Sequence, residues 1–222
     1  MSNEEALDPE LLQRMPVFPL PGLVLLPGCL LPLHFFEPRY RDLARDCLAS
    51  RARCMVIANI ARAEVQDRAP ELMPRACVAR IIEHHKNPDG TYDVLLEGLL
   101  RVSIEDVDSP QAYRLVRAVP LRDRVPEHGL PANDCETARS LMRDIAGMAA
   151  RHRADFQVIA QDSDAPGVWV DRLAYQFVTD RAALQDLLET LDVGARLETV
   201  LHHLVDVRAR LQAALGSKPE LS

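Results

Sequence analysis

Apolar and polar positions follow two different rhythms along the chain. From Met15 to Val119 the apolar residues form short runs separated by turn residues, which is typical of β-strands. From Asn133 onward they recur at the 3.6-residue interval of amphipathic helices. The pattern therefore predicts an α+β protein, with a β domain over residues 10–122 and a helical bundle over residues 123–216. Residues 1–9 and 217–222 are predicted to be disordered tails.

The first apolar stretch, from Met15 to Phe36, carries no charged residue and is long enough to suggest a membrane helix. Five prolines interrupt it: Pro16, Pro19, Pro21, Pro27 and Pro32. Each proline lacks a backbone donor, so no helix survives this spacing. Proline is accepted at strand ends, bulges and edges. The stretch is predicted to supply the first short strands of the β domain, and no membrane association is expected.

The rest of the β half can be divided into elements. Residues 39–50 are predicted to form one amphipathic helix, residues 54–60 a buried strand and residues 62–74 a loop. A hairpin is predicted from strands 77–83 and 91–96, because Asn87-Pro88-Asp89-Gly90 between them has turn chemistry. Two more strands follow at 101–107 and 113–119. About six antiparallel strands are enough to curl into a partly closed barrel.

Residues typical of helix starts mark where helices are predicted to begin within residues 123–216. Asn133, with Glu136 three residues later, resembles a capping box. Asp180 and Asp192 are suited to cap the last two helices. The final helix, over residues 192–215, is predicted to be the longest.

Composition and charge argue against some classes of function. A formal net charge of −7 and a pI near 5.5 argue against a sequence-independent nucleic-acid binder, which needs a basic face. The first five residues include two glutamates and no basic residue, unlike a secretory signal. The five cysteines are odd in number and lack C-x-x-C spacing, which favours buried reduced thiols in a cytoplasmic protein.

Several motifs then fall in a familiar order. The chain contains Phe18-Pro19-Leu20, Pro27-Gly28, Pro32-Leu33, Phe36-Glu37-Pro38-Arg39-Tyr40, Pro88-Asp89-Gly90, Glu97-Gly98-Leu99-Leu100-Arg101, Leu187-Leu188-Glu189 and Arg196-Leu197-Glu198. This order resembles the amino-terminal, substrate-binding domain of the Lon protease family, also found as a free-standing protein. The resemblance implies a PUA-like antiparallel β pseudo-barrel followed by a C-terminal α-helical bundle, and a role in holding protein substrates. Arg75-Ala76-Cys77 departs from the family's usual entry into the hairpin.

The same resemblance supplies a set of structural motif residues. These are Phe18, Pro19, Pro27, Pro32, Phe36, Glu37, Pro38, Gly90, Gly98 and Arg101.

Full-length Lon enzymes add an ATPase and a Ser-Lys peptidase, and the chain lacks the residues that either needs. No Gly-Lys pair is present, so no P-loop can form. The only lysines, Lys86 beside the hairpin turn and Lys218 near the end, are poorly placed to act as a desolvated base. A non-enzymatic protein with no cofactor is expected.

The cysteines and histidines raise two other possibilities, a Cys-His catalytic pair and a metal site. Cys29 or Cys54 could be paired with His34, His84 or His85, but no nucleophile motif surrounds these thiols, and core cysteines are the expected role. His84-His85, and His202-His203 with Asp206, suggest a metal site. Adjacent side chains diverge, however, and no third ligand is signalled. No catalytic or metal site is predicted.

The candidate binding residues surround the first helix. Neighbours on a strand face opposite sides, so only one of Phe35 and Phe36 can be core, and the family pattern makes Phe36 the inward one. Phe35, Tyr40, Leu99 and Leu100 then become candidates for an exposed apolar patch, unless the helical bundle covers them.

Arg39 could bind a peptide carboxylate. Alternatively, Glu37 and Arg39 could pair with each other, or with Arg101 and Glu97, and so fix the junction between strand and helix.

These observations favour a protein-binding or peptide-binding module. Its expected partner is unfolded or extended polypeptide, or a partner protein, and its expected state is a monomer or weak homo-oligomer. Two alternatives remain: an RNA-binding PUA-like module and a small Cys/His hydrolase.

Overall fold

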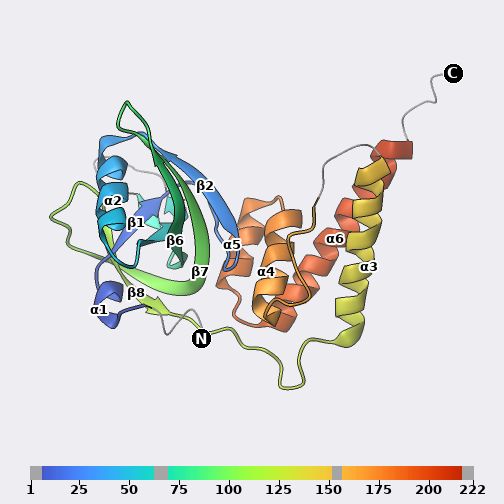
Figure 1. Ribbon diagram of the computed structural model, residues 1–222. Coiled ribbons are helices and arrows are strands. Elements are labelled where there is room, and N and C mark those ends of the chain that lie inside the picture. The colour runs from blue at the N-terminus through green and yellow to red at the C-terminus, as the bar shows by residue number, and fades with distance from the viewer. Residues whose placement is uncertain (1–6, 63–69, 152–156, 217–222) are drawn as a thin grey trace. The chain divides into compact units, whose positions relative to one another are not determined.

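The computed structural model describes residues 7–62, 70–151 and 157–216 (Figure 1). The chain forms two compact units: residues 1–122 with 181–189, and residues 123–180 with 190–222. The tails predicted at 1–6 and 217–222, and residues 63–69 of the predicted loop, lie outside the described residues. Residues 7–9 were also expected to be disordered; instead Leu7 is buried and Pro9 begins a short helix.

The first unit combines a mixed sheet with three helices. Its elements are α1 (Pro9–Leu12), β1 (Met15–Pro19), β2 (Leu30–Phe35), α2 (Pro38–Ala49), β3 (Cys54–Ala58), β4 (Ile60–Arg62), β5 (Glu71–Leu72), β6 (Arg75–Lys86), β7 (Tyr92–Val107), β8 (Leu115–Pro120) and α5 (Arg181–Glu189). Strands β4 and β5 pair with each other as a separate two-stranded sheet. The other six strands form the main sheet, so the α+β class is confirmed.

The main sheet closes on itself. Its strands lie in the order β2-β7-β6-β3-β1-β8, and β7 pairs with β8 as well, which joins β7, β6, β3, β1 and β8 into a ring. One pairing differs from the expected antiparallel sheet, because β1 runs parallel to β3, with Val17 opposite Val56. A parallel neighbour requires a crossover connection, and the long segment containing β2 and α2 provides it.

Strand β7 is long because two predicted strands are continuous. Residues 91–96 and 101–107 were expected as separate strands, whereas β7 runs through both. Gly98 lies in the middle, where a Cβ atom would come within 2.3 Å of the Leu26 carbonyl oxygen. The glycine therefore lets the preceding loop approach the strand backbone.

Alternate side chains of the ring strands point inward and form the core. The buried cluster includes Leu7, Met15, Val17, Val56, Val78, Leu99, Leu100, Val102, Ile104 and Val116. A second group is aromatic: the ring of Phe18 lies 4.9 Å from that of Phe35 and 4.6 Å from that of Tyr40, centroid to centroid. Aromatic packing thus attaches β2 and α2 to β1.

Helix α5 belongs to the first unit, although the sequence placed all of residues 123–216 together. Arg101 on β7 is almost fully buried and donates hydrogen bonds to the carbonyl oxygens of Leu188 (3.1 Å) and Leu187 (3.3 Å). Its charge thereby satisfies the C-terminal end of α5. The alternative pairing of Glu37 with Arg101 is wrong, because Glu37 pairs with Arg39 instead.

The second unit contains the remaining helices, α3 (Ala132–Arg151), α4 (Pro166–Phe177) and α6 (Val193–Gly216). Helix α3 begins one residue before Asn133, and the Cys135 amide donates to the Pro131 carbonyl. The capping box predicted at Asn133 is therefore wrong. Asp192 does cap α6, since its Oδ1 accepts from the Ala195 amide at 3.0 Å.

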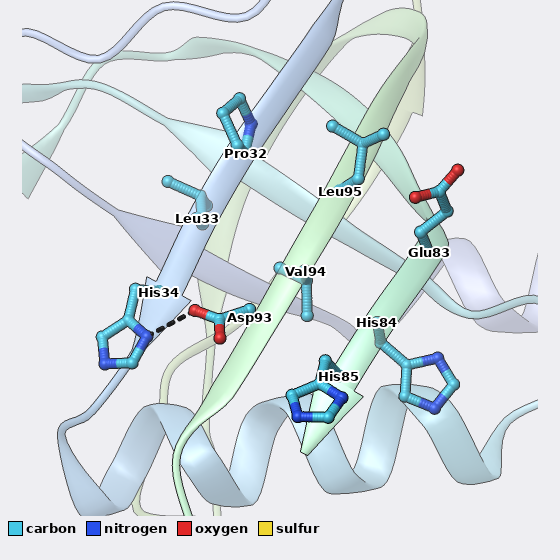
Figure 2. Close-up of a pocket in the computed structure, with 9 residues that line it drawn as sticks. All are labelled: Pro32, Leu33, His34, Glu83, His84, His85, Asp93, Val94 and Leu95. Atoms are coloured by element: carbon cyan, nitrogen blue, oxygen red, sulfur yellow. Dashed lines mark hydrogen bonds and ion pairs between the residues drawn. The ribbon is translucent and has the colours of Figure 1, made fainter. Parts of the chain in front are cut away.

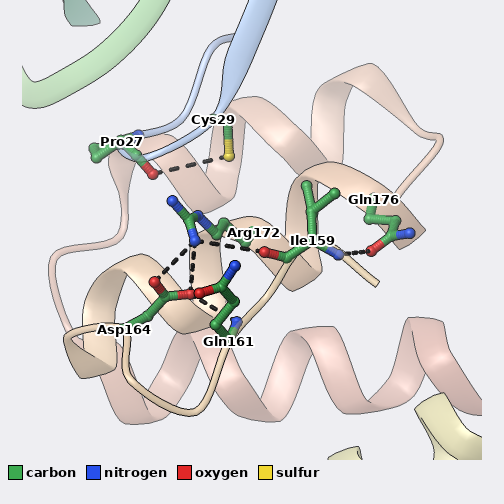
Figure 3. Close-up of polar contacts among 7 residues, drawn as sticks. All are labelled: Pro27, Cys29, Ile159, Gln161, Asp164, Arg172 and Gln176. Carbon is green, nitrogen blue, oxygen red and sulfur yellow. Dashed lines mark hydrogen bonds and ion pairs between the residues drawn. The ribbon is translucent and has the colours of Figure 1, made fainter. Parts of the chain in front are cut away.

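Ion pairs connect the elements of this unit. Arg172 on α4 donates to both carboxylate oxygens of Asp164, at 2.8 and 3.0 Å, and the Gln161 amide donates to the same group (Figure 3). Arg196 on α6 is fully buried and contacts Asp171 and Asp123. Among the described residues, no helix has the length and apolar character needed to cross a bilayer.

Candidate functional site: the open strand of the sheet

The structure reverses the expected roles of the two adjacent phenylalanines. Phe35 is 1% exposed and packs in the aromatic group, whereas Phe36 is 64% exposed. The reason is that Phe35 is the last residue of β2 and keeps the strand's alternation, while Phe36 lies just beyond it. The prediction that Phe36 is the inward residue is wrong.

The remaining candidates do not form an exposed patch either. Tyr40 is buried against Phe18, and Leu99 and Leu100 lie in the core of the same unit. The ring of strands itself covers them. Arg39 is the exposed member of the set; it forms a 2.9 Å ion pair with Glu37, and its guanidinium lies 4.6 Å from the centre of the Tyr40 ring. The pairing of Glu37 with Arg39 thus agrees with one of the two expected alternatives.

Strand β2 is where the sheet remains open. Every strand of the ring has at least two neighbours, but β2 pairs only with β7 among the described residues (Figure 1). At its start, the Gly98 amide donates to the Cys29 carbonyl at 2.9 Å. Because main-chain groups alternate in direction along an antiparallel strand, those of Leu30, Pro32 and His34 then face away from β7. The open side offers three carbonyls and two amides, since Pro32 has no N–H.

The side chains of Pro32 and His34 help to line a shallow depression on the sheet. It measures about 580 Å³ and is bordered by β2, β7 and β6 (Figure 2). Two rows cross the three strands. The members of the first row are Pro32, Leu95 and Glu83, and those of the second are His34, Asp93 and His85.

Apolar surface continues on both sides of this depression. Leu30 is 48% exposed at the start of β2, and Ile82 is exposed at the bulge of β6. Leu30 at the start of β2 and Phe36 just beyond its end leave apolar side chains next to the unpaired main-chain groups of this strand. We call the open edge of β2 and the two rows the β2 site.

The polar row is held in a defined arrangement. His34 Nδ1 lies 2.6 Å from Asp93 Oδ1 (Figure 2). Asn87 of the hairpin turn donates to Asp93 Oδ2 at 2.8 Å. Hydrogen bonds from Asn87 and His34 lower the pKa of Asp93 below its usual value. Gly90, with a φ of +84°, allows the turn to close. The β2 site therefore carries a fixed negative charge between two histidines.

Other chemistry of the chain lies elsewhere. Cys29, Cys47, Cys54 and Cys77 are buried, and Cys135 is partly exposed. Burial raises the pKa of Cys47 to about 12 and also raises that of Cys54. Within the ranges that the structure describes, no three His, Cys, Asp or Glu side chains are grouped to hold a metal ion.

Sequence reasoning missed the β2 site, although a signal for it was present. His34 is polar within an apolar strand, and a polar residue in a strand marks the outward face. Because side chains alternate between the two faces of a strand, Pro32 and Leu30 share the outward face with His34. Phe35, the neighbour of His34, then points inward. Pro32 also marks an edge strand.

Comparison with known proteins agrees with this fold. Residues 14–206 match the model of the ATP-dependent protease La (LON) substrate-binding domain family. The chain belongs to this family. It is 30% identical to a Lon protease of Geobacter metallireducens over 227 residues, covering 96% of this chain and 26% of that protein. It is 28% identical to Lon protease 2 of Sorangium cellulosum over 195 residues, covering 84% and 24%. The chain thus spans about a quarter of the length of these relatives.

Two solved structures share the fold. The N-terminal domain of the Mycobacterium avium complex Lon protease matches with a TM-score of 0.61 at 21% identity, covering 87% of this chain and 99% of that one. A Lon N-terminal domain protein from Xanthomonas campestris matches with a TM-score of 0.59 at 24% identity, covering 86% and 98%.

Proposed function

We propose that this chain is a non-catalytic module that binds extended polypeptide along the open edge of β2. The single observation that carries the proposal is that, in the described part of the chain, β2 has only one neighbour in a sheet that is otherwise closed. Membership in a substrate-binding domain family supports the same class of ligand. A bound segment would add a strand to the sheet, with main-chain hydrogen bonds to Leu30, Pro32 and His34.

The outward side chains suit such a ligand. Alternate residues of an added strand would lie over the face that carries Pro32 and Leu95, beside exposed Leu30 and Phe36. Main-chain pairing accepts many sequences, while the apolar surface favours segments that a folded protein would bury. The expected ligand is therefore unfolded or extended protein, bound without strict sequence preference.

The state of the thiols supports a binding role rather than a catalytic one. A reactive cysteine needs a lowered pKa, and the raised values of Cys47 and Cys54 keep both as neutral thiols at neutral pH. Five free cysteines are also compatible with a reducing, cytoplasmic compartment. We infer a monomer or weak homo-oligomer as the working state.

A charge placed on the open edge tests the proposal. Leu30→Lys puts a solvated ammonium beside the bound segment, and lysine is a common means of blocking strand addition. Val119→Lys is the matched control, because Val119 is 51% exposed but lies on β8, which has two neighbours. Fluorescence anisotropy with labelled, reduced and carboxymethylated lactalbumin, a permanently unfolded protein, measures the affinity of each variant.

We expect Leu30→Lys to weaken binding about tenfold, which corresponds to about 1.4 kcal/mol. Val119→Lys should bind as the parent protein does. Equal affinities for all three proteins, or no saturable binding by folded parent protein, would contradict the proposal.

A further inference from the structure

A second concave surface lies in the helical unit, apart from the β2 site. It measures about 710 Å³, and one face of α6 forms its floor opposite the start of α3. The lining residues are Pro126, Pro131, Asp134, Gly194, Glu198, Leu201, His202, Val205 and Asp206. We call this surface the α6 groove. It contains no lysine or arginine.

The carboxylates of the groove have no cationic partner. Among the described residues, no Lys or Arg nitrogen lies within 4.0 Å of Asp134, Glu198 or Asp206. Elsewhere in this unit several carboxylates are paired with arginines. The pairs are Glu136–Arg143, Asp144–Arg208, Asp162–Arg139, Asp164–Arg172 and Asp171–Arg196. The groove therefore brings together three carboxylates without a Lys or Arg partner in the described ranges, in a unit where many other carboxylates are ion-paired.

Apolar surface lies between these charges. Val205 is 45% exposed, which is unusual for a valine on a helix that packs against two others, and Leu201 lies one turn before it. Pro126 and Pro131 form the opposite wall. His202 is held in place by a 2.9 Å contact between its Nδ1 and the Glu198 carbonyl oxygen. An apolar strip flanked by unpaired acids is the complement of a basic amphipathic segment.

We propose that the α6 groove binds a basic, amphipathic segment of a partner protein, with an apolar side chain on Leu201 and Val205 and flanking Lys or Arg residues on the three carboxylates. The charge selects the partner, because acidic segments and nucleic acid are repelled from this surface. From Gly194 to Asp206 the helix rises about 18 Å, the length of roughly a twelve-residue helix. This site is independent of the β2 site and does not require the function proposed for it.

A titration with a defined peptide tests the groove. The probe is a fluorescein-labelled twelve-residue peptide with Leu at positions i, i+3, i+4 and i+7 and Lys at most other positions, which is the pattern of an amphipathic helix. The test variant, Glu198→Gln with Asp206→Asn, neutralises two groove carboxylates. The control variant, Glu136→Gln with Asp144→Asn, removes the same charge from paired carboxylates outside the groove. Both pairs are at exposed positions, so both variants should fold, which circular dichroism verifies.

We expect the groove variant to weaken binding at least tenfold and the control variant less than twofold. Val205→Ser should also weaken binding to the parent peptide, whereas a peptide with Ser in place of Leu should bind weakly to every variant. Equal effects of the two double variants would show that only net charge matters, and would overturn the proposal. A change in oligomeric state of the groove variant alone, measured by sedimentation without peptide, would assign the groove to a second copy of this chain and would equally overturn it.

Discussion

Arg196 on α6 and Asp171 on α4 form a buried ion pair with an Nη1 to Oδ1 distance of 3.0 Å, and both side chains are at most 1% exposed. A second carboxylate, Asp123, accepts from Nη2 of the same arginine at 2.5 Å. Gly167 at the start of α4 leaves room for this network, because a Cβ atom there would clash with Asp123. The pair therefore connects two helices and the start of the second unit.

Asp171→Asn should destabilise the second unit by about 3 kcal/mol, because it leaves a buried guanidinium with one charged partner. Trp169 is the only tryptophan and lies on α4, so urea unfolding followed by its fluorescence reports on this unit. Asp162→Asn is the control, since the Asp162–Arg139 pair is exposed and should contribute no more than about 1 kcal/mol. If both substitutions lowered the free energy of unfolding equally, burial of the Arg196–Asp171 pair would not be what stabilises the unit.

Gly98→Ala should destabilise the first unit by about 3 kcal/mol, because the new methyl group meets a backbone oxygen that cannot move aside easily. The matched control is Gly147→Ala in α3, where no atom lies closer than 4.0 Å to the added Cβ. That substitution should stabilise its helix by about 0.5–1 kcal/mol. Thermal unfolding followed by circular dichroism measures both. If Gly98→Ala left the thermal stability unchanged, the close approach of the Leu26 carbonyl to Gly98 would be contradicted.

Stability should fall at alkaline pH through the buried thiols. Cys47 keeps its proton up to a pKa of about 12 in the folded protein, against 9.0 for an unperturbed thiol. Above pH 9 the unfolded state therefore loses a proton that the folded state retains, and the stabilisation present below pH 9 declines by about 1.4 kcal/mol per pH unit.

Urea unfolding at pH 8, 9 and 10 tests this expectation. Cys47→Ala should flatten the decline relative to the parent protein, whatever its effect on stability at pH 8. Cys135→Ala is the comparison: Cys135 is less buried and should affect the slope less, although burial raises its pKa too. Parallel slopes for the parent protein and Cys47→Ala would refute the assignment.

Local rules predicted the elements that depend on neighbouring residues. The turn at Pro88-Asp89-Gly90, the helix after Pro38 and the cap at Asp192 are each encoded within a few positions, and the structure confirms all three. The family motifs likewise predicted the fold class and the family.

Long-range features were out of reach. The parallel pairing of β1 with β3 and the pairing of β1 with β8, which closes the ring, depend on residues far apart in the chain. The role of Arg101 depends on carbonyl groups 86 and 87 residues away. The orientation of Phe35 and Phe36 is different, because it is a local feature. Side chains alternate between the two faces of β2, and the outward position of His34 makes Phe35 the inward residue, contrary to the family pattern.

Helix α5 also bears on the order of events during synthesis. The arginine on β7 emerges from the ribosome long before the carbonyls that it contacts at Leu187 and Leu188. Until then a guanidinium destined for burial lacks these two carbonyl partners. The β-rich unit consequently cannot complete its native contacts as the first half of the chain appears, and must wait for a segment that arrives after most of the helical unit has been made.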